Sequence, residues 1–199
     1  MLCKSLKELP FGHMITSSGT VVDLFKPDPD LISIMDIASS LSKICRFGGN
    51  INTFYTVAQH SCLVAWLAPE KLKLTAILHD ASEAYCGDVI RPLKLLLGTK
   101  YTNIEEEWQK AIFSNYNLDY DTIHLIKQYD DQALEMEEKA LFQNSRLFKD
   151  AIKYQSQMWA SYKSVNWWWD FRFAHQAYLE TFHKINGNYK KNLKWIKNF

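Results

Sequence analysis

Apolar residues recur at intervals of three and four along most of this chain, the spacing that gathers them on one face of an α-helix. Strands are indicated only near the start, where Met14–Thr16 and Thr20–Phe25 flank the turn 17–19 as a short hairpin. The pattern therefore predicts an all-α helical bundle with a small N-terminal β-hairpin. Helices are expected at residues 33–44, 56–67, 69–86, 104–116 and 121–144.

Two local signals mark helix ends. Asp36 follows Ser33 by three residues, which is typical of a capping box at the start of the first helix. Gly87 should break the third helix, because glycine readily adopts the conformation that ends one. In the C-terminal third, the run Trp167–Trp169 and its aromatic neighbours are expected to pack in the core or at a subunit interface.

Composition sets the broad class. The chain has 199 residues, of which 47% are hydrophobic, with only 7 Gly and 5 Pro, so we expect one domain over 1–199. Its core should span about 15–185, followed by a basic helix at about 188–199. A net charge of +1 gives no reason to expect a nucleic-acid polymer as partner. No apolar run reaches the roughly 20 residues of a membrane span. Without a signal segment or CxxC spacing, we expect a cytoplasmic protein with reduced thiols.

The chemistry centres on the stretch from Leu78 to Asp88. His79 and Asp80 close an apolar run, and Glu83 comes one helical turn after His79. On a continuous helix, residues four apart share a face, so His79 and Glu83 are predicted to point the same way. One imidazole and two or three carboxylates would then surround a small volume. This suits a divalent ion with a carboxylate positioned to handle a water.

A second histidine and a further aspartate lie on other apolar segments. His60 falls on the predicted helix 56–67, where a lone histidine is usually a satisfied core residue. Asp130 falls on the apolar face of 121–144 and would be costly to bury without a partner, for which a metal is the simplest choice. Asp131 has a helical phase that points away from this face and is expected to be solvated.

The ordered set His60, His79-Asp80 and Asp130 resembles the H…HD…D pattern of the HD-domain metal-dependent phosphohydrolases. The form HDxSEAxxGD at 79–88 is similar to the YfbR-like 5′-deoxynucleotidase branch of that family, and most similar to the phage dATP triphosphohydrolases of the DatZ group. The resemblance runs from about Ile15 to Glu137 and more faintly to about His183.

The resemblance implies a metal centre and its ligands. Two imidazoles and two carboxylates suit a transition metal such as Co²⁺, Mn²⁺ or Zn²⁺ better than Mg²⁺, which prefers oxygen ligands. Glu83 would position or deprotonate the attacking water, and Asp88 would support it. Glu137 matches a family glutamate of structural role. The implied metal ligands are His60, His79, Asp80 and Asp130.

The resemblance also implies substrate contacts. The family carries an arginine before the first metal histidine, so Arg46 would grip a phosphate, although alone it reads as a cap on helix carbonyls. Phe47, Gly49 and Lys94 are further candidates for substrate contact, with a surface cation as the alternative for Lys94. The expected partner is a small deoxynucleotide, in a homo-oligomer such as a dimer or hexamer.

The activity expected from this likeness is hydrolysis of dATP to deoxynucleoside and intact triphosphate, as in phages that replace adenine by diaminopurine. The location would then be the host cytoplasm. Two alternatives remain: a 5′-deoxynucleotidase acting on dNMPs, and a nucleotide-binding protein without catalysis. Other chemistries have little support, since the chain lacks GxSxG, Walker A and GxGxxG motifs and Cys62 lies on a different helix face from His60.

Overall fold

The computed structural model describes residues 6–51, 53–142 and 169–187. Within them the chain is mostly helical with one small antiparallel sheet, so the predicted fold class is confirmed. No helix in these ranges is both long and apolar enough to cross a membrane. The elements are β1 (His13–Ile15), β2 (Val21–Asp23), α1 (Ile34–Leu41), α2 (Val57–Leu67), α3 (Lys73–Leu78), α4 (Glu83–Cys86), α5 (Arg91–Leu97), α6 (Thr99–Asn115), α7 (Lys127–Leu141) and α9 (Phe171–Ile185), with short 3₁₀ helices at Leu6–Glu8, Pro29–Leu31, Arg46–Gly49, Glu70–Leu72 and Tyr120–Ile126.

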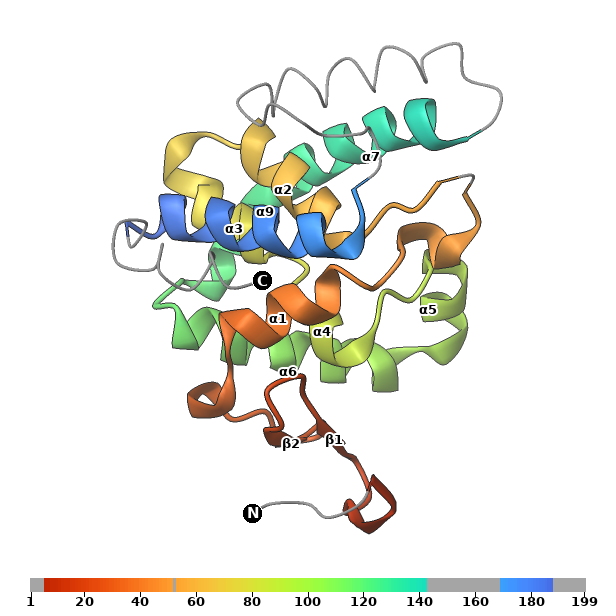
Figure 1. The fold of residues 1–199 in the computed structure, drawn as a ribbon, viewed down its shortest axis with the longest axis vertical. Coiled ribbons are helices and arrows are strands. Elements are labelled where there is room, and N and C mark those ends of the chain that lie inside the picture. Colours follow the sequence, from red (N-terminus) through yellow and green to blue (C-terminus); the bar gives the residue numbers. More distant parts are fainter. Residues whose placement is uncertain (1–5, 52, 143–168, 188–199) are drawn as a thin grey trace.

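Helix α2 lies at the centre of the bundle. Nine of its eleven residues are buried and only Trp66, near its C-terminal end, is exposed, as expected of a helix largely surrounded by others. It packs against α1, α3, α7 and α9, and α9 crosses in front of α2 and α3 in Figure 1. Thr56 caps its start in a reciprocal capping box with Gln59, one residue from the predicted boundary. The helix that carries His60 is therefore held by four neighbouring helices.

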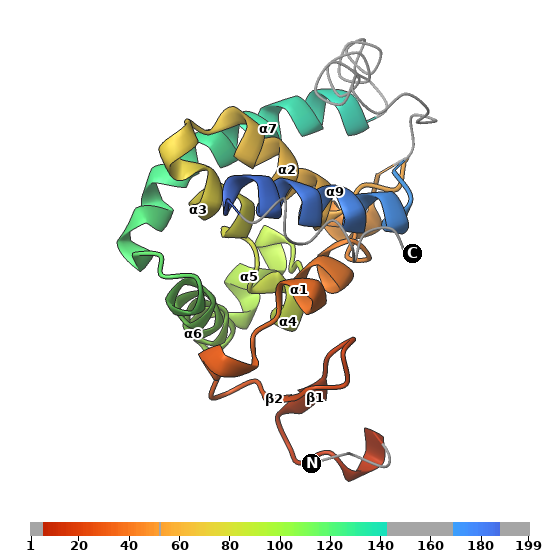
Figure 2. The ribbon, with the colours of Figure 1, turned by 60° about the vertical axis from the view of Figure 1, so that its left-hand side comes forward.

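The hairpin of β1 and β2 lies at the end of the molecule away from α2 and α7, below α1 and α6 (Figures 1 and 2). Its register pairs Met14 with Val22, whose side chain is 2% exposed. Asp36 at the start of α1 holds its turn: Oδ1 accepts bonds from Ser17 Oγ and Ser18 N, both at 2.7 Å, and Oδ2 accepts one from Ser18 Oγ at 2.7 Å. The predicted capping box is therefore wrong in its second half, because Ser33 caps the helix alone while Asp36 binds the hairpin.

The segment 69–86 differs most from its prediction. Instead of one helix, it forms the 3₁₀ helix Glu70–Leu72, then α3, a turn over 79–82, and α4. Backbone bonds in the turn join residues three apart, from Ala81 N to the Leu78 carbonyl and from Glu83 N to the Asp80 carbonyl. Gly87 ends α4 with φ 79°, as the sequence predicts.

Other boundaries shift more modestly. Helix α6 begins at Thr99, five residues before its predicted start, and α5 was not expected at all. The last predicted helix begins as the 3₁₀ helix Tyr120–Ile126 before α7 continues it. Trp169 lies in the core at 6% exposure, while Trp167, Trp168 and the expected basic helix at 188–199 lie outside the described residues.

We expect Asp36→Ala to lower the free energy of unfolding by about 1–3 kcal/mol, because it removes a buried carboxylate that accepts three hydrogen bonds. Burial raises the pKa of Asp36, but bonds from Ser17 and Ser18 lower it more, so the net pKa lies below its ordinary value. The stabilisation is therefore complete above that ordinary value and is lost as pH falls through the lower folded pKa. Urea unfolding at several pH values measures both effects.

The exposed Asp30 provides the control, since Asp30→Ala should change the free energy of unfolding by no more than about 0.5 kcal/mol. Equal destabilisation by the two substitutions would show that Asp36 does not anchor the hairpin.

Candidate metal centre

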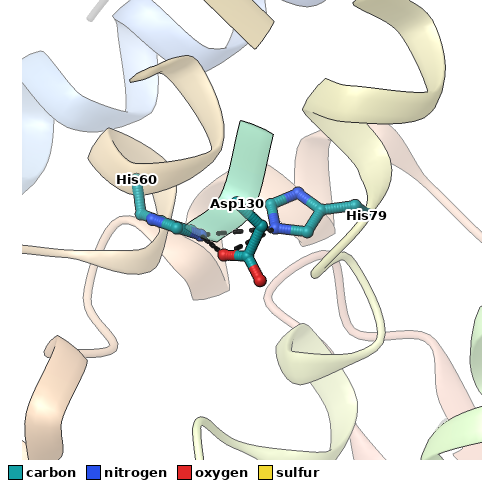
Figure 3. Close-up of side chains that lie close together, drawn as sticks. All are labelled: His60, His79 and Asp130. Atoms are coloured by element: carbon teal, nitrogen blue, oxygen red, sulfur yellow. Dashed lines mark hydrogen bonds and ion pairs between the residues drawn. The ribbon is translucent and has the colours of Figure 1, made fainter. Parts of the chain in front are cut away.

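Three segments bring two histidines and an aspartate together (Figure 3). His60 comes from the middle of α2, His79 from the C-terminal end of α3, and Asp130 from the first turn of α7. The Nε2 atoms of the histidines are 3.3 Å apart, and Asp130 Oδ1 lies 3.2 Å from His60 Nε2 and 4.0 Å from His79 Nε2. One atom from each residue thus faces a common point, in an arrangement compatible with a divalent metal ion.

Asp80 adds a fourth atom to this set. Its Oδ2 lies 3.4 Å from His60 Nε2 and 3.2 Å from His79 Nε2. Ligands that sit about 2.1 Å from one ion must be separated from each other by roughly 3–4 Å. These five separations all lie in that range, so the residues present fit such an ion.

Hydrogen bonds at the far side of each ring fix which nitrogen faces the centre. His79 Nδ1 donates to the Ala76 carbonyl at 2.8 Å, since a carbonyl can only accept. His60 Nδ1 lies 2.6 Å from Glu137 Oε1 and donates to that carboxylate. In its neutral form each ring therefore turns its Nε2 lone pair to the centre, as metal-binding histidines do when a carbonyl or carboxylate holds the other nitrogen.

The electrostatics of the centre favour a positive charge. Burial and Arg46 lower the pKa of His60, but Glu137, Asp130 and Asp80 raise it, and the net pKa lies well above its ordinary value. Burial raises the pKa of Asp80, yet the two histidines bring it well below its usual range. Acidic groups that stabilise a proton on His60 also stabilise a metal cation at this point, because both effects follow from the same negative potential.

Asp130 is the member of its pair that reaches the centre. The neighbouring Asp131 is 53% exposed and pairs with Lys127 on the outer side of α7. The helical phase that distinguished the two aspartates in the sequence is therefore the phase seen in the structure.

Glu137 links the first histidine to two more side chains. Its Oε1 also accepts from Tyr55 Oη at 2.9 Å, and its Oε2 accepts from Arg46 Nε and Nη2 at 3.2 and 3.1 Å. Burial raises the pKa of Glu137, but His60 and Arg46 lower it by more. The net pKa therefore lies below its ordinary value, and this buried carboxylate stays ionised. The sequence indicated a structural role for Glu137; it gave no sign of the part played by Tyr55.

Arg46 lies between two carboxylates. Beyond its bonds to Glu137, its Nη1 lies 3.7 Å from Asp80 Oδ2, longer than a hydrogen bond. These side-chain contacts go to carboxylates, not to the helix carbonyls of the alternative interpretation. The next residue, Phe47, has φ 58°, a left-handed conformation that costs energy for a bulky side chain. Gly49 is exposed in the same turn, with open space where a Cβ would point.

Glu83 is buried beside the centre, at 5% exposure. Burial raises its pKa well above the ordinary value, and the neighbouring charges of Asp80 and Asp88 raise it further. Among the described residues, its Oε2 has no hydrogen-bond partner. The predicted helix face shared with His79 is not observed, because the turn at 79–82 interrupts the helix between the two residues.

The remaining predicted contacts lie around Glu83. Asp88 is half-buried, and burial raises its pKa while Arg46 lowers it. Lys94 on α5 pairs with Glu105 at 2.7 Å, and that contact raises its pKa against the effect of burial. Lys94 also acts on the pKa of Glu83, so it lies within electrostatic reach of the centre.

Two buried residues near the centre had no predicted role at this site. Gln109 on α6 and Tyr178 on α9 both bond to the backbone at the end of α3. A signal existed for Gln109: it precedes Ile112 by three residues and Phe113 by four, which places a polar side chain on the buried face of its helix. Cys62 is buried with its pKa raised to about 12, which agrees with the argument against a cysteine nucleophile.

Comparison with known proteins gives two similar sequences and no matching family model. The uncharacterized protein YfdR of Escherichia coli K12 is 46% identical over 103 residues, which cover 52% of this chain and 57% of YfdR. An uncharacterized protein of Rhodobacter capsulatus is 36% identical over 110 residues, covering 51% of this chain and 56% of that protein. The match thus spans little more than half the length of either curated relative.

Proposed function

We propose that this protein is a divalent-metal-dependent phosphohydrolase acting on 2′-deoxynucleotides, with dATP cleaved to deoxyadenosine and triphosphate. The observation that carries the proposal is the convergence of two imidazole nitrogens and two carboxylate oxygens at separations of 3.2–4.0 Å. The ordered motif that resembles the HD-domain phosphohydrolases supplies those same four residues, His60, His79, Asp80 and Asp130.

The metal would be held by these four side chains, and its mixed nitrogen and oxygen ligands favour Co²⁺, Mn²⁺ or Zn²⁺. A bound ion of this kind lowers the pKa of a water and polarises a phosphoryl oxygen. Glu137 and the Ala76 carbonyl keep both imidazoles in the tautomer that can bind it.

Glu83 is the proposed proton acceptor. Its buried carboxylate has a raised pKa and one free oxygen among the described residues, which are the properties of a general base in a site closed to bulk water. It would take the proton of a water that attacks the α-phosphorus. The bond from phosphorus to the 5′-oxygen would then break, and that oxygen would take up a proton and leave as the 5′-hydroxyl of deoxyadenosine. Asp88 neighbours Glu83 and would orient the same water.

Arg46 and Lys94 are the proposed phosphate contacts. Arg46 donates Nε–H and Nη2–H bonds to Glu137. Its Nη1 lies 3.7 Å from Asp80, too far for a hydrogen bond, and would have N–H groups to donate to a phosphate oxygen. Lys94 would add positive charge from α5. The turn of Phe47 and Gly49 follows Arg46 directly and would line the same substrate.

Product analysis tests the reaction. Purified protein with dATP and Co²⁺ or Mn²⁺ should yield deoxyadenosine and intact triphosphate, resolved by ion-exchange chromatography. Glu83→Gln should slow turnover by about 10²–10⁴-fold, because it keeps the shape of the side chain but cannot accept the proton. The exposed Glu107→Gln on α6 is the control and should retain full activity.

Turnover of dAMP alone would replace the triphosphohydrolase by a 5′-deoxynucleotidase. Full activity of Glu83→Gln would remove the proposed base, and metal binding without turnover of either nucleotide would contradict the enzymatic proposal.

We also expect Glu137→Gln to weaken metal binding by about 10–100-fold, because it weakens the acceptor that orients His60 and leaves Arg46 without its carboxylate. Calorimetric titration of chelator-treated protein with Mn²⁺ measures the change. Tyr55→Phe removes only one of the three groups bound to Glu137 and should have the smaller effect. An unchanged affinity in Glu137→Gln would show that His60 needs no such support.

A further inference from the structure

The turn that separates α3 from α4 contains a side chain from a distant helix. Gln109 lies on α6 and is 3% exposed. Its Nε2 donates to the Leu78 carbonyl at 2.7 Å, and its Oε1 accepts from Ser82 N at 3.1 Å. In a continuous helix Ser82 N would donate to the Leu78 carbonyl directly, since these residues are four apart. The amide of Gln109 thus bridges the two partners of one missing helical bond.

A second side chain completes the break. Tyr178 lies on α9 and is fully buried, and its Oη donates to the Ile77 carbonyl at 2.9 Å. That carbonyl would accept from Ala81 N in a continuous helix, but Ala81 N donates instead to the Leu78 carbonyl at 3.1 Å. The Ile77 and Leu78 carbonyls and Ser82 N therefore each keep a hydrogen-bond partner. A side chain inserted into the helical ladder is an established cause of a sharp bend.

The break has a direct consequence for the metal centre. It encloses His79 and Asp80. His79 Nε2 and Asp80 Oδ2 lie only 3.2 Å apart, although successive side chains on an α-helix diverge by about 100°. The bonds between residues three apart mark a tighter 3₁₀ turn, in which residues i and i+3 share a face. Asp80 and Glu83 are such a pair, and Asp80 is the nearby charge with the greatest effect on the pKa of Glu83.

We propose that Gln109, assisted by Tyr178, is a positioning residue that shapes the turn from Leu78 to Ser82 and thereby aims His79 and Asp80 at the metal centre. Neither side chain bonds to the two ligands; each acts through the backbone around them. The inference rests on the proposed function only in requiring that a divalent ion binds at this centre.

Titration of chelator-treated protein with Co²⁺ tests the proposal, because the visible absorption of bound Co²⁺ reports its ligand geometry as well as its affinity. Gln109→Met keeps the length of the side chain and removes both hydrogen bonds. It should weaken Co²⁺ binding by about 10–100-fold and change the absorption spectrum. Amide hydrogen exchange at Ser82 in the metal-free protein should become faster.

Asn115→Leu is the matched control. Asn115 is a partly buried amide on the same helix that donates to the Ile32 carbonyl at 3.3 Å, away from the centre. This variant should keep the Co²⁺ affinity and spectrum even if its melting temperature falls as far as that of Gln109→Met. If it weakens binding equally, the effect is general loss of stability and the positioning role is overturned.

Two further outcomes separate this inference from the proposed function. A wild-type protein that binds no Co²⁺ would overturn the metal centre itself. Tight binding by the wild type, with the same affinity and spectrum in Gln109→Met, would overturn only the positioning role. Should Gln109→Met not fold, Tyr178→Phe removes a single hydroxyl and carries the test by the same two readouts.

Discussion

The structure depends on a buried cluster of ring nitrogens and carboxylate oxygens that requires a proton or a metal cation among them. With both imidazoles neutral, two ring nitrogens and the oxygens of Asp80 and Asp130 converge within 3.2–4.0 Å. Burying such a set costs free energy unless a cation joins it. Glu137 makes the arrangement more negative still while it holds His60 in place. The helices around α2 therefore build a site whose stable form includes positive charge.

Arg46 supplies part of that charge, and under the proposed function it would couple substrate binding to metal binding. Its guanidinium keeps Glu137 ionised through two bonds and reaches toward Asp80 with its free end. A phosphate that draws on the Nη1 end would compete with Asp80, one of the four converging ligands. The arginine would thus contact both the metal site and the substrate. The strained turn at Phe47 follows it directly and restricts the position of its backbone.

Features set by local periodicity could be predicted from the sequence. The hairpin, the extent of α2 and the preference for Asp130 over Asp131 all follow from side-chain spacing within one element. The broken helix at 79–82 could not be predicted in this way, because its residues are all compatible with a helix and include neither glycine nor proline. Its cause, Gln109, lies some 30 positions away in the chain and acts only once α6 has packed.

The error about the helix also changes how Glu83 is understood. Helical spacing would place Glu83 on the same face as His79, whereas the tighter turn places it on the same face as Asp80. The charge of Asp80 raises the pKa of Glu83, in addition to the larger effect of burial. A cation bound by Asp80 offsets that charge and lowers the pKa of Glu83. The glutamate would then lose its proton most readily when the centre is loaded, so that the group able to accept a proton from water becomes available only where the metal is present to activate that water.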